Sequence, residues 1–341
     1  MARRLTETAV PGGIAAEDGG WPGAGRLRSW DTHRVLDDSV LGDWCRQFLG
    51  SRPVRVLFRT GHLSQVIAAE LGDGRQVVIK ARPPGLRIAG CVAVQAHLAR
   101  AGFPCPDPLT GPEQAGGLTV TAETLIPGGS QLPPEHGAAP FAALLACLIA
   151  SAPDPAAVSG LSPSPPWTGW DHPGTRLWPD RDDHGRDLNH IPGPAWVDAA
   201  ARRVRERLAA SGTLPRVGHG DWESQNIRWR GTRPLVVHDW DSVIAQPEPA
   251  IVGLAAAVWP AAGAPGQAAT VTQSADFIAS YQAAAGRPWT GPETRDAWAA
   301  GLWVRLFNAK KDAADGGGPQ LDRLAAEIDQ RMSLAALSPS S

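Results

Sequence analysis

The sequence predicts an α+β protein of two lobes, in which a small antiparallel sheet precedes a larger helical part. Three strand-like runs at residues 54–59, 65–71 and 76–81 are joined by short segments containing Gly, Ser and Asp, a pattern typical of an antiparallel meander. Beyond residue 129, apolar residues recur at helical spacing instead. With 341 residues, both parts are long enough to bury a hydrophobic core.

The smaller lobe is expected at residues 31–127, after a flexible N-terminal arm at residues 1–30 that is rich in Gly, Ala and Pro. Helical spacing of apolar residues after Asp38 predicts a short leading helix. A second helix is predicted at residues 90–101, because Gly and Pro follow it and prevent its continuation. A further strand is predicted at residues 118–126.

The larger lobe is expected at residues 128–337, followed by a disordered tail at residues 338–341. Its apolar periodicity predicts helices around residues 141–148, 197–208, 275–285, 293–310 and 321–337. Residues 163–194 are dense in Trp, Asp, His, Pro and Gly, which predicts irregular surface structure and a candidate wall for a substrate pocket.

Composition argues against several classes of partner. The net charge of −2 provides no overall attraction to nucleic acid or to an anionic membrane, so neither is expected as a partner. No stretch approaches the ~18 consecutive apolar residues that span a bilayer, and no apolar export signal follows the first arginines. The four cysteines form no C-x-x-C pair, so no zinc knuckle or disulfide framework is indicated. We expect a cytoplasmic protein, and the sequence does not specify its oligomeric state.

Two polar motifs in the larger lobe indicate chemistry. Asp221 precedes Asn226 by five positions, and Asp239 follows one predicted hairpin later, which is the order of the catalytic Asp and the two magnesium ligands in phosphoryl-transfer enzymes. A hairpin at residues 227–238 would place Asn226 and Asp239 side by side at its open end. Asp221 would orient an attacking hydroxyl and take its proton, while the other two offer hard oxygen ligands suited to Mg²⁺.

A lysine near the end of a predicted strand is the second indication. Of 32 basic residues only Lys80, Lys310 and Lys311 are lysine, so a lysine in this chain is informative. Lys80 follows Val-Val-Ile, the position of a strand lysine that reaches nucleotide phosphates. Gly61 and Ser64 lie in the preceding turn, where backbone amides can approach phosphates. We therefore predict that these residues bind a nucleotide.

With these residues the chain resembles the aminoglycoside phosphotransferase and choline kinase family over about residues 50–335. The resemblance rests on His-Gly-Asp at 219–221, the Asn five positions after the Asp, and the strand ending in Asp-Trp-Asp at 239–241. It implies a bilobal protein-kinase-like fold and an O-phosphotransferase that uses ATP or GTP with Mg²⁺. The implied acceptor is a hydroxyl of a small molecule, such as an aminoglycoside, a sugar or an amino alcohol.

The resemblance also implies roles for individual residues. By this similarity Asp221 is the catalytic aspartate, Asn226 and Asp239 bind magnesium, and Lys80 contacts the nucleotide. Residues from Glu123 to Ile126 match the hinge between the lobes, whose backbone holds the base of the nucleotide.

Two positions depart from the pattern of that family. The helix after the lysine strand usually supplies a Glu that pairs with the lysine, whereas this helix offers Cys91, Gln95 and His97 but no acid. We expect Gln95 to hydrogen-bond Lys80 without neutralising it. An Asp that often precedes Leu-Ala in a later helix is replaced by Gly253. The missing acid on the helix after the lysine strand leaves open a second function, a kinase-like nucleotide-binding protein with weak or no transfer activity.

Several residues near the motifs have two interpretations. His219 is expected to form structural hydrogen bonds rather than to shuttle protons. Asp241 either assists the metal or substrate, or caps a turn. The acids at residues 171–187 either attract a cationic acceptor or form a solvated loop balanced by arginines. Candidates for stacking on a sugar are Trp167, Trp170 and Trp178.

A metal-dependent hydrolase is a third hypothesis, built on the two histidines and two aspartates of the polar motifs. It lacks the additional His and carboxylate motifs of such enzymes and leaves Lys80 without a role. The phosphotransferase hypothesis accounts for all of these residues.

Overall fold

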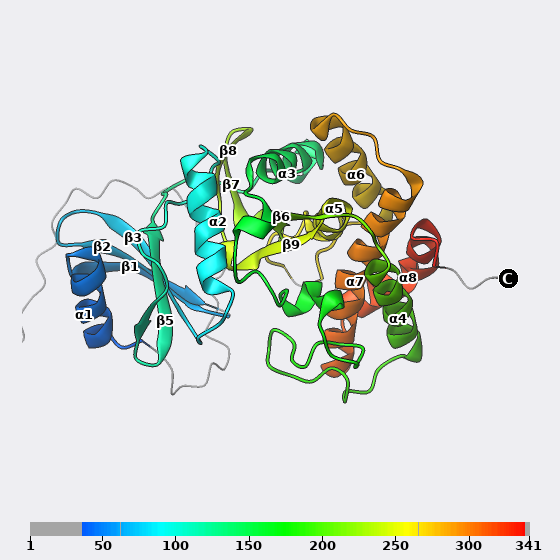
Figure 1. Cartoon of the computed structure of the whole chain (residues 1–341), viewed down its shortest axis with the longest axis horizontal. Coiled ribbons are helices and arrows are strands. Elements are labelled where there is room, and N and C mark those ends of the chain that lie inside the picture. Colours follow the sequence, from blue (N-terminus) through cyan, green and yellow to red (C-terminus); the bar gives the residue numbers. More distant parts are fainter. Residues whose placement is uncertain (1–35, 62, 265, 338–341) are drawn as a thin grey trace, which may run out of the picture.

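The computed structural model describes residues 36–61, 63–264 and 266–337. The predicted arm at residues 1–30 and the predicted tail at residues 338–341 lie outside the described residues. The described chain forms a sheet-containing lobe and a larger lobe of helices, which lie on the left and on the right of Figure 1. The predicted α+β class is confirmed.

The smaller lobe is built on one antiparallel sheet. Its strands are β1 (Pro53–Gly61), β2 (Gln65–Leu71), β3 (Gln76–Arg82), β4 (Glu113–Ala115) and β5 (Leu118–Thr124), in the order β1-β2-β3-β5-β4. The predicted meander of three strands is present with nearly the predicted bounds. The strand β4 was not predicted, because three residues are too few to show an alternating pattern.

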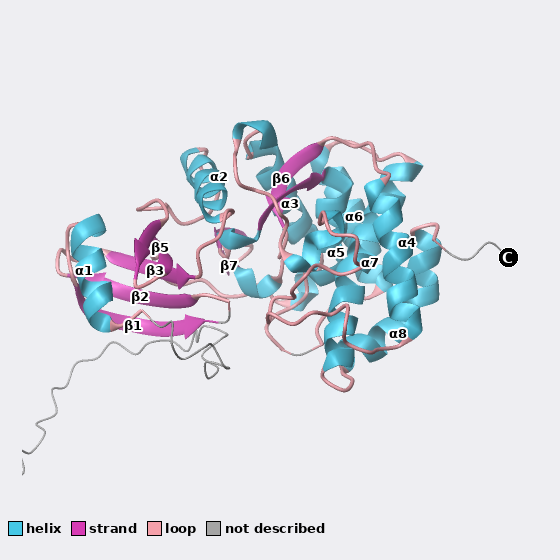
Figure 2. Cartoon of the chain, turned by 60° about the horizontal axis from the view of Figure 1, so that its bottom comes forward, coloured by secondary structure: helices cyan, strands magenta, loops and turns pink. Residues whose placement is uncertain are grey.

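Different helices cover the two faces of this sheet (Figures 1 and 2). Helix α1 (Asp38–Leu49) begins where the side chain of Asp37 accepts hydrogen bonds from two backbone amides, and it ends at Gly50 in a left-handed conformation. Its apolar side packs with Ile79, Val120 and other inward residues of the sheet. Successive strand residues face opposite sides, so Lys80 points away from this core, toward α2.

Helix α2 (Ile88–Arg100) lies between the sheet and the helical lobe. Its buried residues Cys91, Val94 and Leu98 belong to the hydrophobic core of the larger lobe. The guanidinium of Arg87 at its start donates hydrogen bonds to the carbonyl oxygens of Leu161 and Val243, both in the larger lobe. The helix is therefore packed as part of the helical lobe, although it precedes β5 in the chain.

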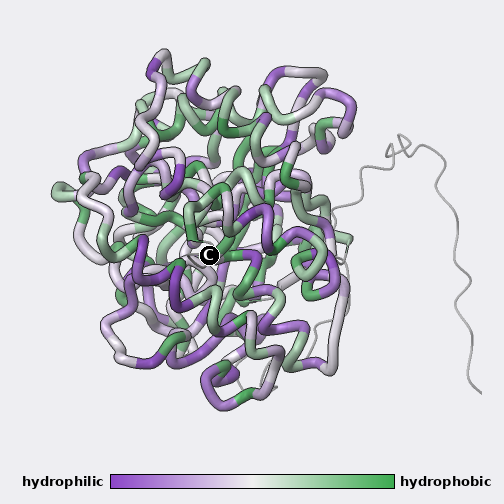
Figure 3. Tube along the Cα trace, turned by 90° about the vertical axis from the view of Figure 1, so that its right-hand side faces the viewer, coloured by the Kyte–Doolittle hydropathy of each residue, from purple (hydrophilic) through white to green (hydrophobic). Residues whose placement is uncertain are grey.

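The larger lobe surrounds two short antiparallel pairs with helices. The helices are α3 (Ala139–Ser151), α4 (Ala195–Ala209), α5 (Glu248–Val258), α6 (Val271–Ala285), α7 (Gly291–Ala314) and α8 (Pro319–Leu334), and the strand pairs are β6 (Pro215–His219) with β9 (Val243–Pro247) and β7 (Ile227–Arg230) with β8 (Arg233–Val237). Seen from the right-hand side of Figure 1, apolar segments run through the interior and hydrophilic ones lie mostly outside (Figure 3). The β6–β9 pair was not predicted, because it joins two short segments that are distant in sequence.

Two glycines allow α5 and α7 to approach closely. A Cβ added at Gly253 would lie 1.9 Å from the carbonyl oxygen of Ala297, and one added at Gly301 would lie 2.6 Å from the carbonyl oxygen of Gly253. Contacts this short exclude any side chain at position 253. The absence of the acid found there in similar sequences therefore has a packing reason.

Within the described part of the chain, no helix is both long enough and apolar enough to cross a lipid bilayer.

Gly253→Ala is expected to destabilise the protein by about 3 kcal/mol or more, because α5 and α7 must separate to admit a methyl group. Urea unfolding followed by circular dichroism measures the change in the free energy of unfolding. Gly212→Ala is the matched control, since a Cβ there meets no atom within 4 Å. Equal stability of the two variants would contradict the packing argument.

Candidate active site

Asp221 and Asn226 are joined directly in the loop after β6. The side-chain amide of Asn226 donates hydrogen bonds to Oδ2 of Asp221 (2.9 Å) and to the carbonyl oxygen of Asp221 (3.0 Å). A short 3₁₀ turn, Ser224–Asn226, closes the loop before β7 begins. The spacing of five residues thus corresponds to a compact loop whose two polar side chains orient each other.

The predicted hairpin brings Asp239 to the same place. Ile227 lies opposite Val237 in the β7–β8 pair, and the amide of His238 donates to the carbonyl oxygen of Asn226 (2.8 Å). Asp239 follows immediately in a left-handed conformation with φ of 62°, and its Oδ2 accepts a hydrogen bond from the hydroxyl of Ser242 (2.8 Å). Asn226 and Asp239 therefore flank the open end of the hairpin, as predicted.

His219 links the Asp221 loop to the Asp239 segment through hydrogen bonds that involve both nitrogens of its ring. Its Nδ1 accepts the backbone amide of Asp221 (3.2 Å), so Nε2 carries the hydrogen and donates to the carbonyl oxygen of His238 (3.1 Å). The ring is fully buried between Trp222 and Trp240, and this burial lowers its pKa. A neutral, bridging His219 is the structural role expected from the sequence.

The charge around Asp221 is predominantly negative. Burial raises the pKa of Asp221 to about 7, and the charges of Asp239 and Asp183 add to this rise, against the hydrogen bond from Asn226. Burial also raises the pKa of the neighbouring Glu223, and the charge of Asp221 adds to it. A positive charge entering this region would be stabilised.

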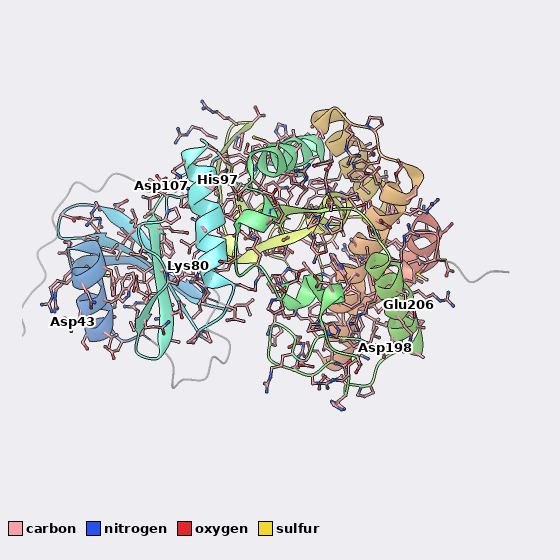
Figure 4. The ribbon with its side chains drawn as sticks, in the orientation of Figure 1. Asp43, Lys80, His97, Asp107, Asp198 and Glu206 are labelled. Carbon is pink, nitrogen blue, oxygen red and sulfur yellow. The ribbon has the colours of Figure 1, made fainter. Side chains whose placement is uncertain are left out.

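Lys80 is paired with an acid from the sheet, which corrects two predictions. Its Nζ lies 3.3 Å from Oε1 of Glu123, and the side chain of Gln95 donates to Oε2 of Glu123 (2.9 Å) rather than to Lys80. Glu123 is inside β5, opposite Val78, so it is not part of the hinge. Figure 4 labels Lys80 beside α2, on the side of the sheet facing the helical lobe. No local sequence pattern indicates this pair, because Lys80 and Glu123 meet only through the register of β3 with β5.

The connection between the lobes begins after β5. Leu125 donates its amide to the carbonyl oxygen of Gln76, and Ile126 follows with a half-buried side chain. Ser130 then pairs with Trp229 of β7 through two backbone hydrogen bonds. Of the predicted hinge residues, Ile126 lies in this connection.

The turn between β1 and β2 lies at the same end of the sheet as Lys80. Gly61 is opposite Gln65, and Val66, one residue further along β2, is opposite Lys80 in β3. A Cβ added at Gly61 would lie 2.2 Å from the carbonyl oxygen of Ser64, so only glycine fits this turn. Gly61 and Ser64 therefore lie near the Lys80 end of the sheet.

Asp241 joins the lobes, which neither sequence interpretation anticipated. Its carboxylate pairs with the guanidinium of Arg82 (2.9 Å), two residues beyond Lys80 on β3. Arg82 is buried and also donates to the hydroxyl of Thr121 (3.1 Å). Arg82, two residues after the strand lysine, is the sequence feature that indicates this ion pair.

The acids of residues 171–187 are mostly paired with arginines. Arg176 pairs with Asp180 and Asp187, and Arg186 pairs with Asp182, which supports the interpretation of a balanced loop. Asp183 differs from these acids, because its partner is Lys311 of α7 (2.5 Å) and its charge acts on Asp221. The loop therefore contributes one ion pair to the neighbourhood of Asp221.

Two of the three tryptophans proposed for sugar stacking lie in the hydrophobic core. Trp170 and Trp178 are buried and their rings pack against Trp303, so neither offers a face to a ligand. Trp167 is half-buried and donates its indole N–H to the carbonyl oxygen of Gly220 (2.9 Å). It holds the loop that carries Asp221.

The donor set fits a hard divalent cation. The described residues contain no cluster of three His, Cys, Asp or Glu side chains of the kind that encloses a metal. Asn226 and Asp239 each retain a side-chain oxygen that accepts no hydrogen bond from the described residues. Two oxygen ligands suit Mg²⁺, which keeps several waters and shares phosphate oxygens of its substrate.

A family model of the phosphotransferase enzyme family matches residues 56–244, more than half of the 341 residues. The chain belongs to the phosphotransferase enzyme family. The matched region of this phosphotransferase begins in β1 and ends in β9, so it includes Lys80, Asp221 and Asp239. No curated protein matches the sequence.

Solved structures of small-molecule kinases share the fold of this phosphotransferase. An aminoglycoside phosphotransferase mutant with ADP and hygromycin B has 18% identity and a TM-score of 0.55, covering 89% of this chain and 100% of its own. An amicoumacin kinase with AMP-PNP and Ca²⁺ has 11% identity and a TM-score of 0.57, covering 85% and 92%. A macrolide 2'-phosphotransferase has 18% identity and a TM-score of 0.52, covering 90% and 99%. The bilobal protein-kinase-like fold is confirmed.

Asp221→Asn is expected to stabilise the metal-free phosphotransferase above pH 7 and to have little effect near pH 4. In the folded protein the Asp221 carboxyl has a pKa of about 7, above its value in the unfolded chain. The wild type therefore loses stability as the pH rises from the unfolded pKa to the folded one. Removing the charge should raise Tm by about 2–4 °C at pH 8.

Scanning fluorimetry in EDTA across this pH range measures the difference in Tm. Asp276→Asn, which removes an exposed acid on α6, is the control and should change Tm by less than about 1 °C at pH 8. A difference between Asp221→Asn and wild type that does not vary with pH would contradict the expectation.

Proposed function

We propose that the protein is a Mg²⁺-dependent O-phosphotransferase that moves the γ-phosphoryl group of ATP or GTP to a hydroxyl of a small molecule. Membership of the phosphotransferase enzyme family supports the reaction class. The observation that carries the proposal is the contact of Asn226 with Asp221 at the open end of the hairpin that holds Asp239. These are the three polar groups that phosphoryl transfer requires on the helical side of the site.

Asp221 is assigned the part of catalytic base. A carboxylate whose pKa lies near neutrality accepts a proton effectively at the pH of a cell. The hydrogen bond from Asn226 leaves Oδ1 of Asp221 to accept the hydroxyl proton of the acceptor. In this arrangement Asp221 orients the attacking oxygen and takes its proton as the new bond to phosphorus forms.

Asn226 and Asp239 are assigned to the magnesium ion. When bound, Mg²⁺ neutralises charge on the nucleotide phosphates. Ser242 holds one oxygen of Asp239, so the carboxylate keeps a single orientation. Lys80 would contact the phosphates from the sheet, the turn at Gly61 and Ser64 would cover them, and the backbone near Ile126 would hold the base.

The acceptor region favours a polar, positively charged molecule. Glu223 and Asp239 lie near Asp221, and Asp183 adds further negative charge that Lys311 offsets only in part. An amino alcohol or an amino sugar combines the hydroxyl that Asp221 requires with a cation that these carboxylates would attract.

The alternative function, nucleotide binding with weak or no transfer, was motivated by the missing acid partner of Lys80. Glu123 provides such a partner, so this reason for the alternative function no longer applies. Turnover by the wild-type protein separates the two functions: nucleotide binding without hydrolysis or transfer to any acceptor would favour the alternative.

Magnesium-dependent binding of ATP or GTP is expected for the wild-type protein and is expected to be lost in Asp239→Ala, because Asn226 alone is an insufficient ligand set. Calorimetry with each nucleotide, with and without Mg²⁺, measures this. Asp276→Ala, an exposed acid on α6, is the control. No binding of either nucleotide to wild type would refute the proposed function.

Asp221→Ala is expected to reduce phosphoryl transfer by about 10²- to 10⁴-fold while nucleotide binding remains, because it removes the base but no nucleotide ligand. Turnover is followed by ADP or GDP release in the presence of an acceptor panel, and binding by calorimetry. Unchanged turnover in this variant would exclude Asp221 as the base.

A further inference from the structure

The sheet supplies a carboxylate that α2 lacks. No residue of α2 (Ile88–Arg100) is acidic, yet Lys80, which faces this helix, is buried. A buried ammonium with no counter-ion tends to lose its proton. The position of Lys80 therefore requires an acid from another element.

Strand register places Glu123 where it can meet this need. Val78 lies opposite Glu123 and Lys80 lies opposite Thr121, so Lys80 and Glu123 are diagonal neighbours on one face of the sheet. Long side chains bridge such a diagonal. Their charged atoms are 3.3 Å apart, and only 11% and 8% of the two side chains are exposed. The pair is thus shielded from water and from salt.

Gln95 fixes the other oxygen of Glu123. Its Nε2 donates to Oε2 of Glu123 (2.9 Å) and to the carbonyl oxygen of Pro106 (3.0 Å), so both hydrogens of the amide are used. Gln95 and Glu123 are buried. With Lys80 on one oxygen and Gln95 on the other, the carboxylate has one orientation.

We propose that Glu123 of β5 is the positioning residue for Lys80, and that Gln95 of α2 holds Glu123 in place. The inference rests on the proposed role of Lys80 in binding nucleotide phosphates. One donor of the ammonium faces Glu123, which leaves two for phosphate oxygens.

In this arrangement the position of Lys80 is set by a residue of the same sheet. Helix α2 is packed in the core of the helical lobe, through Val94 and Leu98 among others. An acid on that helix would couple Lys80 to the relative position of the lobes, whereas an acid on the adjacent strand does not. Among the hydrogen bonds and ion pairs of the described residues, the one from Gln95 connects α2 to the pair.

The surrounding charges keep Lys80 protonated. Burial lowers the pKa of Lys80, and the charge of Arg82 lowers it slightly further. The negative charges of Glu123, Asp241 and Asp239 raise it by more, so the net pKa is raised. Glu123 is the largest of the raising influences. Removing the charge of Glu123 would therefore lower the pKa of Lys80.

Titration of Lys80 tests the pair without any nucleotide. The chain has three lysines, so a spectrum of ¹³C-labelled lysine side chains contains three signals, and Lys80→Arg assigns one of them. Glu123→Gln is expected to lower the midpoint of that titration by about one pH unit or more. Glu70→Gln, which removes a surface acid paired with Arg55 on the same sheet, is the control and should leave it in place.

Turnover tests what the pair does. In the presence of Mg²⁺ and the nucleotide that wild type binds, Glu123→Gln is expected to reduce kcat by about tenfold or more, because a displaced Lys80 no longer holds the phosphates in the reactive geometry. Glu123→Gln combined with Gln95→Glu moves the carboxylate to the adjoining position on α2 and, because the hydrogen bond to the carbonyl oxygen of Pro106 is lost, is expected to recover part of the lost turnover. Such rescue would not follow from a merely structural role for Glu123. Thermal unfolding verifies that each variant is folded.

The outcomes separate this inference from the proposed function. An unchanged Lys80 midpoint in Glu123→Gln, or turnover equal to that of Glu70→Gln, overturns the inference. If Glu123→Gln does not fold, the exchanged double variant decides: turnover above a tenth of wild type supports the inference, and turnover below a tenth of wild type in a folded protein overturns it. If wild type binds no nucleotide, the proposed function fails, and the titration alone decides whether Glu123 holds Lys80.

Discussion

Burial of charge where the two lobes meet is the constraint on which this site depends. Lys80 and Arg82 project from β3 into a buried region, where a charge without a partner of opposite sign is costly. Glu123 meets Lys80 from within the sheet, and Asp241 meets Arg82 from the helical lobe. One pair therefore orders the sheet side of the site, while the other fixes the sheet against the loop that follows Asp239.

The helical side of the junction between the lobes carries negative charge, whereas the sheet side carries the positive charges of Lys80 and Arg82. Asp221, Asp239 and Glu223 are close together, and burial, followed by the charges of Asp239 and Asp183, raises the pKa of Asp221 to about 7. Such an excess of carboxylates is costly for the empty protein but favours a cation that arrives with a substrate. The same groups that reduce stability thus prepare the site for its chemistry.

Packing behind the site makes this arrangement rigid. His219 links the strand before Asp221 to the residue before Asp239, and indole rings hold it on two sides. Behind β6 and β9, α5 meets α7 through Gly253 and Gly301 at a separation that only glycine permits. The position where similar sequences carry an acid is therefore used here for close helix packing.

The local features of the protein follow from its amino-acid sequence. The meander of the small lobe, the hairpin and the five-residue spacing of Asp221 and Asn226 were all readable, because turns and periodicity depend on residues close together in the chain. Which charges meet depends instead on how the strands and lobes pack. Glu123 reaches Lys80, and Asp241 reaches Arg82, because strand register and lobe packing join residues that are distant in sequence, and no local pattern carries that information.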